Sequence, residues 1–254
     1  MESLFNEYVS VLREINFHSF NHDEDKYSGV FLPVPFNDYW VSSLKIMLVG
    51  RETAGWNTDN QKNTIKRIAE FSEKNKLSDL VQEATERYKK HLPVSDCGKV
   101  ITKTRSRFKQ YFFQLAKELE VNPKSIIYAN LFAWDYDKKS PTGRPKNELE
   151  EITRISKKLL AIQIKHFKPD VIIFCAGLAG VDQIIKDIFN DNFNGYNNGE
   201  LISGKYWEFN PVNKDFLNVD CYRVAHPRAT YGHGEYRDKV ISRIRKRMTT
   251  ERLV

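Results

Sequence analysis

Three short segments of the chain place an acid, an amide and an imidazole close to the end of an apolar run. Glu52 follows "KIMLVG" by two residues, Asn130 lies in "SIIYANLFAW", and His226 follows "CYRVA". A carboxylate can orient water or stabilise a positive charge, an amide can read a nucleobase edge, and an imidazole can donate to a growing oxyanion. Each side chain alone also suits a cap or a turn, so the hypothesis of a shared site depends on their occurring together.

The elements that must position these side chains alternate along the chain. Short apolar runs predict four buried strands, over residues 43–50, 125–134, 169–177 and 219–227. Amphipathic periodicity predicts helices over residues 2–15, 107–120, 148–167, 178–190 and 234–248. This alternation is typical of an α/β fold, a three-layer α/β/α arrangement around a central, mainly parallel four-stranded sheet. Ligands bind beyond the carboxyl ends of such strands, where Glu52, Asn130 and His226 would converge.

Two further stretches add to this plan. Residues 57–92 are charge-rich and predict two helices, which together with a loop over 93–104 form a helical insertion at about 57–104. A Gly- and Asn-rich stretch over 194–204, followed by "YWEFN", predicts a hairpin. The whole chain, residues 1–254, is predicted to form a single domain with this insertion.

The composition indicates a real hydrophobic core. The 254 residues are 41% hydrophobic and include 16 Phe, 12 Tyr and 4 Trp, which excludes a disordered chain. The net charge of +7 is compatible with a phosphate-rich partner, although many proteins with such an excess bind none.

The cysteines and the apolar runs bear on the compartment. Cys97, Cys175 and Cys221 are far apart and odd in number, which argues against a disulfide framework and against a cysteine-based metal site. Reduced thiols suggest a cytoplasmic, intracellular protein. The first 20 residues lack the apolar core of a secretory signal, and the run over 171–181 is too short to span a bilayer, so we expect no membrane partner.

The three segments, in this order and spacing, resemble the motifs of the uracil-DNA glycosylase superfamily. "KIMLVGRET" resembles the first motif, "SIIYANLFAW" resembles the strand that carries the pyrimidine-reading Asn, and "VAHPRATYGHG" resembles the motif that begins His-Pro-Ser. Residues 147–177 resemble the superfamily's helix and third strand. The resemblance spans about residues 44–247 and implies a monofunctional DNA glycosylase, which flips a nucleotide out of double-stranded DNA and hydrolyses its N-glycosidic bond.

The resemblance also implies a role for each matched residue. The catalytic pair would be Glu52, which stabilises the sugar cation and orients water, and His226, which donates to the base oxygen. The substrate pocket would be lined by Gly50, Arg51, Thr53, Ala54, Trp56 and Asn130. Arg228, Thr230 and Tyr231 would grip phosphate and enter the minor groove, with Tyr231 as the wedge. Separately, Arg105 and Arg107 stand near a helix start, where cations can face phosphates.

The departures from the motifs shape the expected substrate. Some branches have Asp or Asn in place of Glu52, and Arg228 replaces the Ser of His-Pro-Ser. Ala54 and Gly55 are small where the uracil-specific branch has a Tyr that excludes a 5-methyl group, which predicts a roomier pocket unless Trp56 refills it. We therefore expect uracil or a 5-modified pyrimidine as substrate, in DNA repair or in antiviral defence against modified foreign DNA.

The expected cofactors and partners follow from the same motifs. The iron–sulfur branches need four cysteines, which this chain lacks, so we expect no cluster, no metal and no other cofactor. DNA is the expected partner, and a monomer is the expected state. Two other classes of function stay open: a non-catalytic module that binds a modified base on the same fold, and an unrelated nucleotide-handling enzyme. The latter would need a phosphate-binding Gly loop or a carboxylate cluster, and neither pattern occurs in the sequence.

Overall fold

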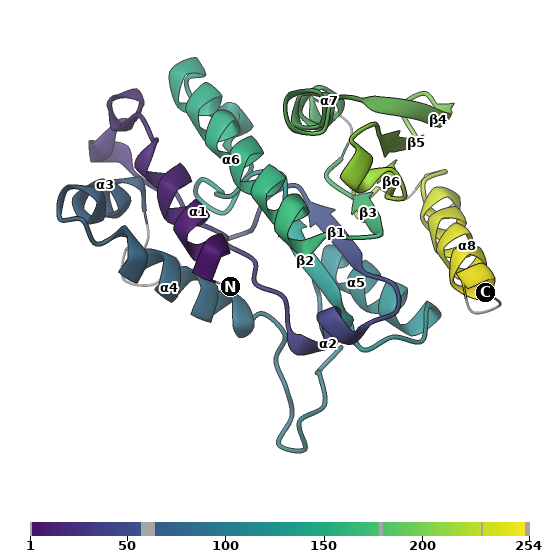
Figure 1. Ribbon diagram of the computed structural model, residues 1–254. Helices are drawn as coiled ribbons and strands as arrows, with labels where there is room; N and C mark the ends of the chain where they lie inside the picture. The colour runs from purple at the N-terminus through teal and green to yellow at the C-terminus, as the bar shows by residue number, and fades with distance from the viewer. Residues whose placement is uncertain (1, 57–63, 178–179, 230, 252–254) are drawn as a thin grey trace. The chain divides into compact units, whose positions relative to one another are not determined.

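The computed structural model describes residues 2–56, 64–177, 180–229 and 231–251 (Figure 1). The contacts group the chain into two compact units, each built from three separate segments. Unit 1 comprises Met1–Val34, Arg51–His91 and Ala129–Phe167, and unit 2 comprises Pro35–Gly50, Leu92–Tyr128 and Lys168–Val254.

A six-stranded sheet forms the centre of unit 2, and one of its strands continues into unit 1 at Ala129 and Asn130. The strands are β1 (Ile46–Gly50), β2 (Ile126–Asn130), β3 (Val171–Phe174), β4 (Tyr196–Ile202), β5 (Tyr206–Pro211) and β6 (Asp220–Val224). Their order across the sheet is β2-β1-β3-β6-β5-β4. β3 is parallel to both β1 and β6, whereas β5 is antiparallel to β6 and to β4.

The predicted count of four strands is therefore wrong, because the sheet is mixed and has six strands. The hairpin expected from its Gly- and Asn-rich stretch is present as β4 and β5, and it extends the sheet beyond β6. Register pairs run from Tyr206 with Val224 to Phe209 with Cys221. Alternate residues of β5 are buried, which suits a strand whose apolar positions must face a core on one side.

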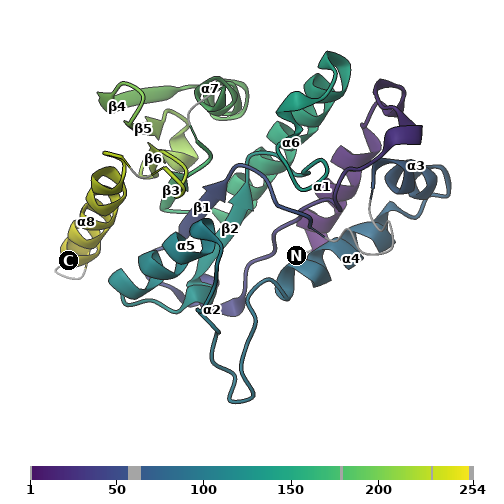
Figure 2. The ribbon, with the colours of Figure 1, turned by 180° about the vertical axis from the view of Figure 1, so that it is seen from behind.

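Helices cover both faces of this sheet within unit 2. One face carries α5 (Arg107–Glu118) and α8 (Gly234–Glu251), whose Phe112 and Ile241 share a buried cluster with Ile46 and Leu48 of β1 (Figure 2). The opposite face carries α7 (Val181–Asn192), where Phe189 packs edge-to-face against Phe174 of β3. This division follows the alternation of side chains along each strand. The short helix α2 (Asn37–Val41) completes the α-helices described in this unit.

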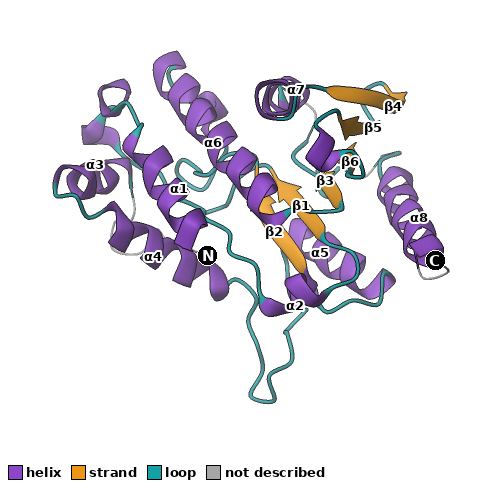
Figure 3. Cartoon of the chain, viewed as in Figure 1, coloured by secondary structure: helices purple, strands orange, loops and turns teal. Residues whose placement is uncertain are grey.

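Unit 1 is built mainly from α-helices (Figure 3). They are α1 (Glu2–Arg13), α3 (Ile65–Glu73), α4 (Leu77–Lys89) and α6 (Lys146–Phe167). The helix α1 contacts both α4 and α6, and its buried Tyr8 donates a hydrogen bond to the Pro33 carbonyl at 2.8 Å. The two helices predicted between residues 57 and 92 are confirmed as α3 and α4, while residues 57–63 lie outside the described residues.

Short 3-10 helices connect these elements. They lie at Phe17–Ser19, His22–Glu24, Pro123–Ser125, Pro141–Gly143 and Lys214–Phe216.

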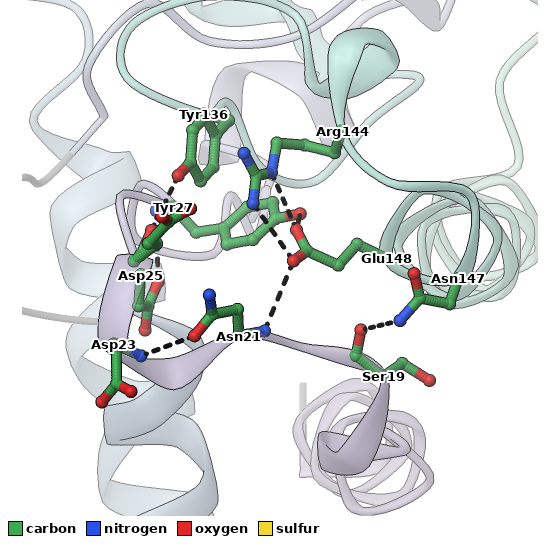
Figure 4. A network of polar contacts seen from close by, with 10 residues as sticks. Ser19, Asn21, Asp23, Asp25, Tyr27, Tyr136, Arg144, Asn147 and Glu148 are labelled. Carbon is green, nitrogen blue, oxygen red and sulfur yellow. Dashed lines mark hydrogen bonds and ion pairs between the residues drawn. The ribbon is translucent and has the colours of Figure 1, made fainter.

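A buried carboxylate in the first turn of α6 ties the N-terminal segment to that helix (Figure 4). Glu148 accepts hydrogen bonds from the Tyr27 hydroxyl at 2.7 Å, the Arg144 guanidinium at 2.8 and 3.1 Å, and the Asn21 backbone N–H at 3.3 Å. The Arg144 guanidinium also stacks on the Tyr136 ring at 3.9 Å. Burial opposes ionisation of Glu148, but the hydrogen bonds from Arg144 and Tyr27 outweigh it and hold its pKa below the usual value.

Candidate functional site

The segment that follows β1 lies beside the segment that follows β2, within unit 1. The backbone N–H of Phe132 donates to the Arg51 carbonyl at 2.8 Å. Glu52 is the next residue after Arg51, and Asn130 precedes Phe132 by two residues. Two of the three predicted functional side chains therefore belong to neighbouring backbone segments, as expected for groups just beyond two adjacent strands.

Asp135 organises the loop that carries Glu52. Its carboxylate is completely buried, and one oxygen accepts hydrogen bonds from the Thr53 hydroxyl at 2.5 Å and from the backbone N–H groups of Gly55 at 2.9 Å and Trp56 at 3.3 Å. The other oxygen accepts from the Lys138 backbone N–H at 3.0 Å. Thr53, which was predicted to line the substrate pocket, is thus engaged in positioning the loop. Asp135 was not among the predicted site residues, although an acid directly after the apolar "LFAW" was a signal for it.

Glu52 is partly buried, and its carboxylate oxygen Oε2 is inaccessible to solvent. Its side chain is 20% exposed, and the Arg51 guanidinium approaches it at 3.4 Å. Arg51 also reaches the Thr142 hydroxyl at 3.4 Å. An ionised carboxylate at this position can orient water or stabilise a positive charge.

Asn130 is a buried amide whose hydrogen-bonding capacity is unused. Its side chain is 5% exposed, and neither Nδ2 nor Oδ1 has a hydrogen-bond partner in the structure. Buried polar groups are almost always hydrogen-bonded, because desolvation without a partner is costly. An amide left in this state at the end of a strand points to a ligand that supplies both a donor and an acceptor.

The small and aromatic residues of the loop take different positions. Ala54 is exposed, whereas the Trp56 ring packs edge-to-face on Phe31, with 4.8 Å between ring centroids. The Arg87 guanidinium of α4 lies 5.6 Å from the Trp56 ring centroid. These contacts anchor the Trp56 ring inside unit 1. The roomier pocket expected from Ala54 and Gly55 stays a prediction.

His226 belongs to unit 2 and follows the carboxyl end of β6. The register aligns Val49 of β1 with Phe174 of β3, and Phe174 with Arg223 of β6. Gly50, the last residue of β1, and His226 therefore lie at the same edge of the parallel strands. His226 Nδ1 accepts a hydrogen bond from the Arg228 backbone N–H at 3.1 Å. A neutral ring held in this way carries its proton on Nε2, so Nε2 is the nitrogen that can donate.

The predicted DNA-contacting residues of unit 2 are at its surface. Arg228 is exposed, and Tyr231 is 94% exposed, which is an unusual state for a large aromatic ring. Thr230 lies outside the described residues. Arg105 and Arg107 are both exposed around the N-cap of α5, and Arg107 donates to the Gln110 amide oxygen at 3.2 Å.

Arg223 is a second residue that the sequence analysis missed. Its side chain on β6 is buried, and it donates to Asp182, in the first turn of α7, at 2.7 Å. Two of its nitrogens, Nε and Nη1, have no hydrogen-bond partner in the structure. The pair lies on the α7 face of the sheet, and Arg223 precedes His226 by three residues in the sequence.

The described part of the chain offers neither a metal site nor a membrane span. Within it, no three His, Cys, Asp or Glu side chains gather as a metal site would require. No helix there is long and apolar enough to cross a bilayer. No family model matches the chain, and no curated protein matches it. The resemblance to the uracil-DNA glycosylase superfamily stays a prediction based on the motifs.

Proposed function

We propose that this protein is a monofunctional DNA glycosylase, which hydrolyses the N-glycosidic bond of uracil or a 5-modified pyrimidine in double-stranded DNA. The observation that carries the proposal is the buried amide of Asn130, which has no hydrogen-bond partner among the residues that the structure describes. A pyrimidine edge presents adjacent donor and acceptor groups that complement an amide. A base flipped out of the duplex can bring that edge into a buried site.

The chemistry divides between an acid and an imidazole. As the N-glycosidic bond lengthens, positive charge grows on the sugar and negative charge on the departing base. The Glu52 carboxylate stabilises the sugar cation and orients the attacking water. The Nε2–H of His226 donates to the base oxygen on which negative charge grows. Both groups would then stabilise the transition state more than the ground state.

DNA binding in this proposal uses the exposed groups of unit 2. Arg228 neutralises phosphate, Tyr231 enters the minor groove as a wedge, and Arg105 and Arg107 contact the backbone. The three-layer α/β/α arrangement, with the substrate beyond the carboxyl ends of the strands, is part of the same proposal. The proposal also includes a monomeric intracellular enzyme, a reaction without a cofactor, and a role in repair or in defence against modified DNA.

An excision assay tests the proposal. Matched duplexes carry uracil, thymine opposite guanine, 5-hydroxymethyluracil, 5-hydroxymethylcytosine or glucosylated 5-hydroxymethylcytosine, and alkali reveals abasic sites. We expect the wild-type protein to excise at least one of these bases. Glu52→Gln should lower the rate by about 10²–10⁴-fold and His226→Ala by about 10²–10³-fold, with DNA binding kept. Glu150→Gln, on an exposed turn of α6, is the matched control and should retain full activity.

The choice of base reports on the loop after Glu52. Excision of uracil alone would indicate a pocket closed by a side chain such as Trp56. Excision only of bases with a substituent on C5 would support the roomier pocket beside Ala54.

The alternative is a binding module that recognises a modified base without excising it. The departures from the motifs at Glu52 and Arg228 keep this alternative open. Tight binding to one duplex without excision of any base, and with Glu52→Gln binding equally well, would support the module and contradict the glycosylase.

A further inference from the structure

Lys138 occupies a strained turn next to the loop that carries Glu52. Asp137 and Lys138 have φ angles of 49° and 62°, in the left-handed region that residues with a Cβ rarely adopt. The turn is held in this shape from both sides. The Lys138 backbone N–H donates to the buried Asp135 carboxylate at 3.0 Å, and the Asp137 N–H donates to the Lys26 carbonyl at 3.0 Å.

The aliphatic stem of Lys138 lies directly over Gly55. A Cβ placed on Gly55 would lie 3.1 Å from Cγ, 3.5 Å from Cδ and 3.4 Å from Cε of Lys138. This close approach is possible because Gly55 has no side chain, and its φ of +84° also favours glycine. Asp135 fixes both partners, since the same carboxylate binds the backbone N–H groups of Gly55 and Lys138. The lysine is therefore built into the support of the Glu52 loop.

The charge of Lys138 is available for a ligand. The residue is exposed, and it forms no ion pair with any residue in the described ranges. Its basic neighbours differ, because Arg51 lies against Glu52 at 3.4 Å and Arg144 binds Glu148 at 2.8 Å. A lysine ammonium is a compact point charge that suits a phosphate oxygen. A cation held by its backbone and stem loses less side-chain entropy when such a contact forms.

We propose that Lys138 is a substrate-positioning residue, whose ammonium binds a DNA phosphate next to the flipped nucleotide. The proposal rests on the proposed glycosylase function, because the Gly55 contact places the lysine beside the loop of Glu52. The contact would fix the position of the nucleotide's backbone relative to Glu52. Lys138 would not touch the reacting atoms, so it would act through position alone.

Binding at graded salt concentration tests this contact without any knowledge of the base. Fluorescence anisotropy would measure the affinity for a duplex with a tetrahydrofuran abasic analogue at the target position. The slope of log K against log salt is negative, and each lysine–phosphate contact contributes about 0.9 to its magnitude. Loss of one such contact therefore lowers the magnitude of the slope by about 0.9. We expect this reduction for Lys138→Gln and expect Lys138→Arg to keep the wild-type slope. Lys146→Gln is the matched control, because this exposed lysine pairs with Glu150 on α6.

Methylphosphonate linkages locate the phosphate. One neutral linkage at a time would replace the phosphates on either side of the analogue. One of these should weaken wild-type binding and leave binding by Lys138→Gln unchanged, because that contact is already lost. Equal sensitivity of the two proteins at every linkage, together with an unchanged salt slope, would overturn the proposal for Lys138.

The outcomes separate this inference from the proposed function. If the wild-type protein excises a base while Lys138→Gln keeps the full salt slope, only the role of Lys138 fails. If the slope falls as expected but no base is excised, the glycosylase fails and the phosphate contact stands. If the wild-type protein does not bind the duplex, both are overturned.

Discussion

Replacing Asn130 by Leu should stabilise the free protein while it removes the predicted base reader. Asn130 is 5% exposed, and within the described ranges neither polar atom of its amide has a hydrogen-bond partner. Each buried group without a partner costs about 1–3 kcal/mol of desolvation in the folded state. Leu has a similar volume and no polar atoms, so it removes this cost.

The expected size of the effect follows from two opposing contributions. At the lower figure of about 1 kcal/mol for each of the two unsatisfied atoms, their removal should give about 2 kcal/mol, and imperfect packing of the branched side chain should take back up to about 1.5 kcal/mol. The net gain in the free energy of unfolding is then about 0.5–2 kcal/mol. For a chain of this size, that gain raises Tm by about 1–8 °C. Excision should fall below detection.

Thermal unfolding by calorimetry and urea unfolding would measure the gain, beside the excision assay. The matched control is Asn210→Leu, because the Asn210 amide donates to the Val219 carbonyl at 2.9 Å and to Asp220 at 3.1 Å. That variant should lose about 1–2 kcal/mol. A lower Tm for Asn130→Leu, with excision retained, would refute the view that this amide is reserved for a ligand.

Three further predictions concern buried charges. Asp135→Asn replaces an acceptor of four hydrogen bonds by a group that also donates. It should therefore lower the free energy of unfolding, measured in urea, by about 3 kcal/mol or more, and should lower excision as well. Unchanged stability would contradict the structural role of Asp135. Glu148 has a lowered pKa in the folded protein, so its stabilisation is complete above the unfolded pKa of about 4.3 and is lost as the pH falls toward the folded pKa. Thermal melts from pH 7 to 3 should therefore show a steeper acid loss for the wild-type protein than for Glu148→Gln, and parallel curves would argue against this. Asp182→Asn leaves the buried Arg223 guanidinium without its counter-charge and should lower the free energy of unfolding by about 2 kcal/mol or more. A second change, Arg223→Met, should restore part of that loss. A double variant less stable than Asp182→Asn would be inconsistent with this reasoning.

The helices and the parallel strands could be predicted because their signals are local. The runs that became β1, β2, β3 and β6 are short, apolar and flanked by polar residues, and the helices showed clear amphipathic spacing. The count of strands could not be predicted in the same way. The hairpin of β4 and β5 was recognisable from its turn residues, but its pairing with β6 depends on contacts between segments far apart in the chain.

The residues of the candidate site also differ in whether the sequence around them carries a local signal. Glu52, Asn130 and His226 could be selected from the sequence, because each follows or ends an apolar run. Asp135 was missed although it directly follows an apolar run, because that position alone does not separate a buried acid from a surface residue until its partners are known. Those partners lie about 80 positions away, on the backbone of Gly55 and Trp56. Arg223 was hidden within a run expected to be apolar.

The interleaving of the two units has a consequence for synthesis on the ribosome. The chain crosses between the units five times, after residues 34, 50, 91, 128 and 167. A nascent chain that has emerged as far as Phe167 holds every segment of unit 1 but only β1 and β2 of the sheet. The apolar surface of those two strands then stays exposed to aggregation or mispairing until β3 and β6 have been translated. Because Glu52 and Asn130 each follow a crossing by two residues, the groups proposed for catalysis and base reading are tied to the late completion of that sheet.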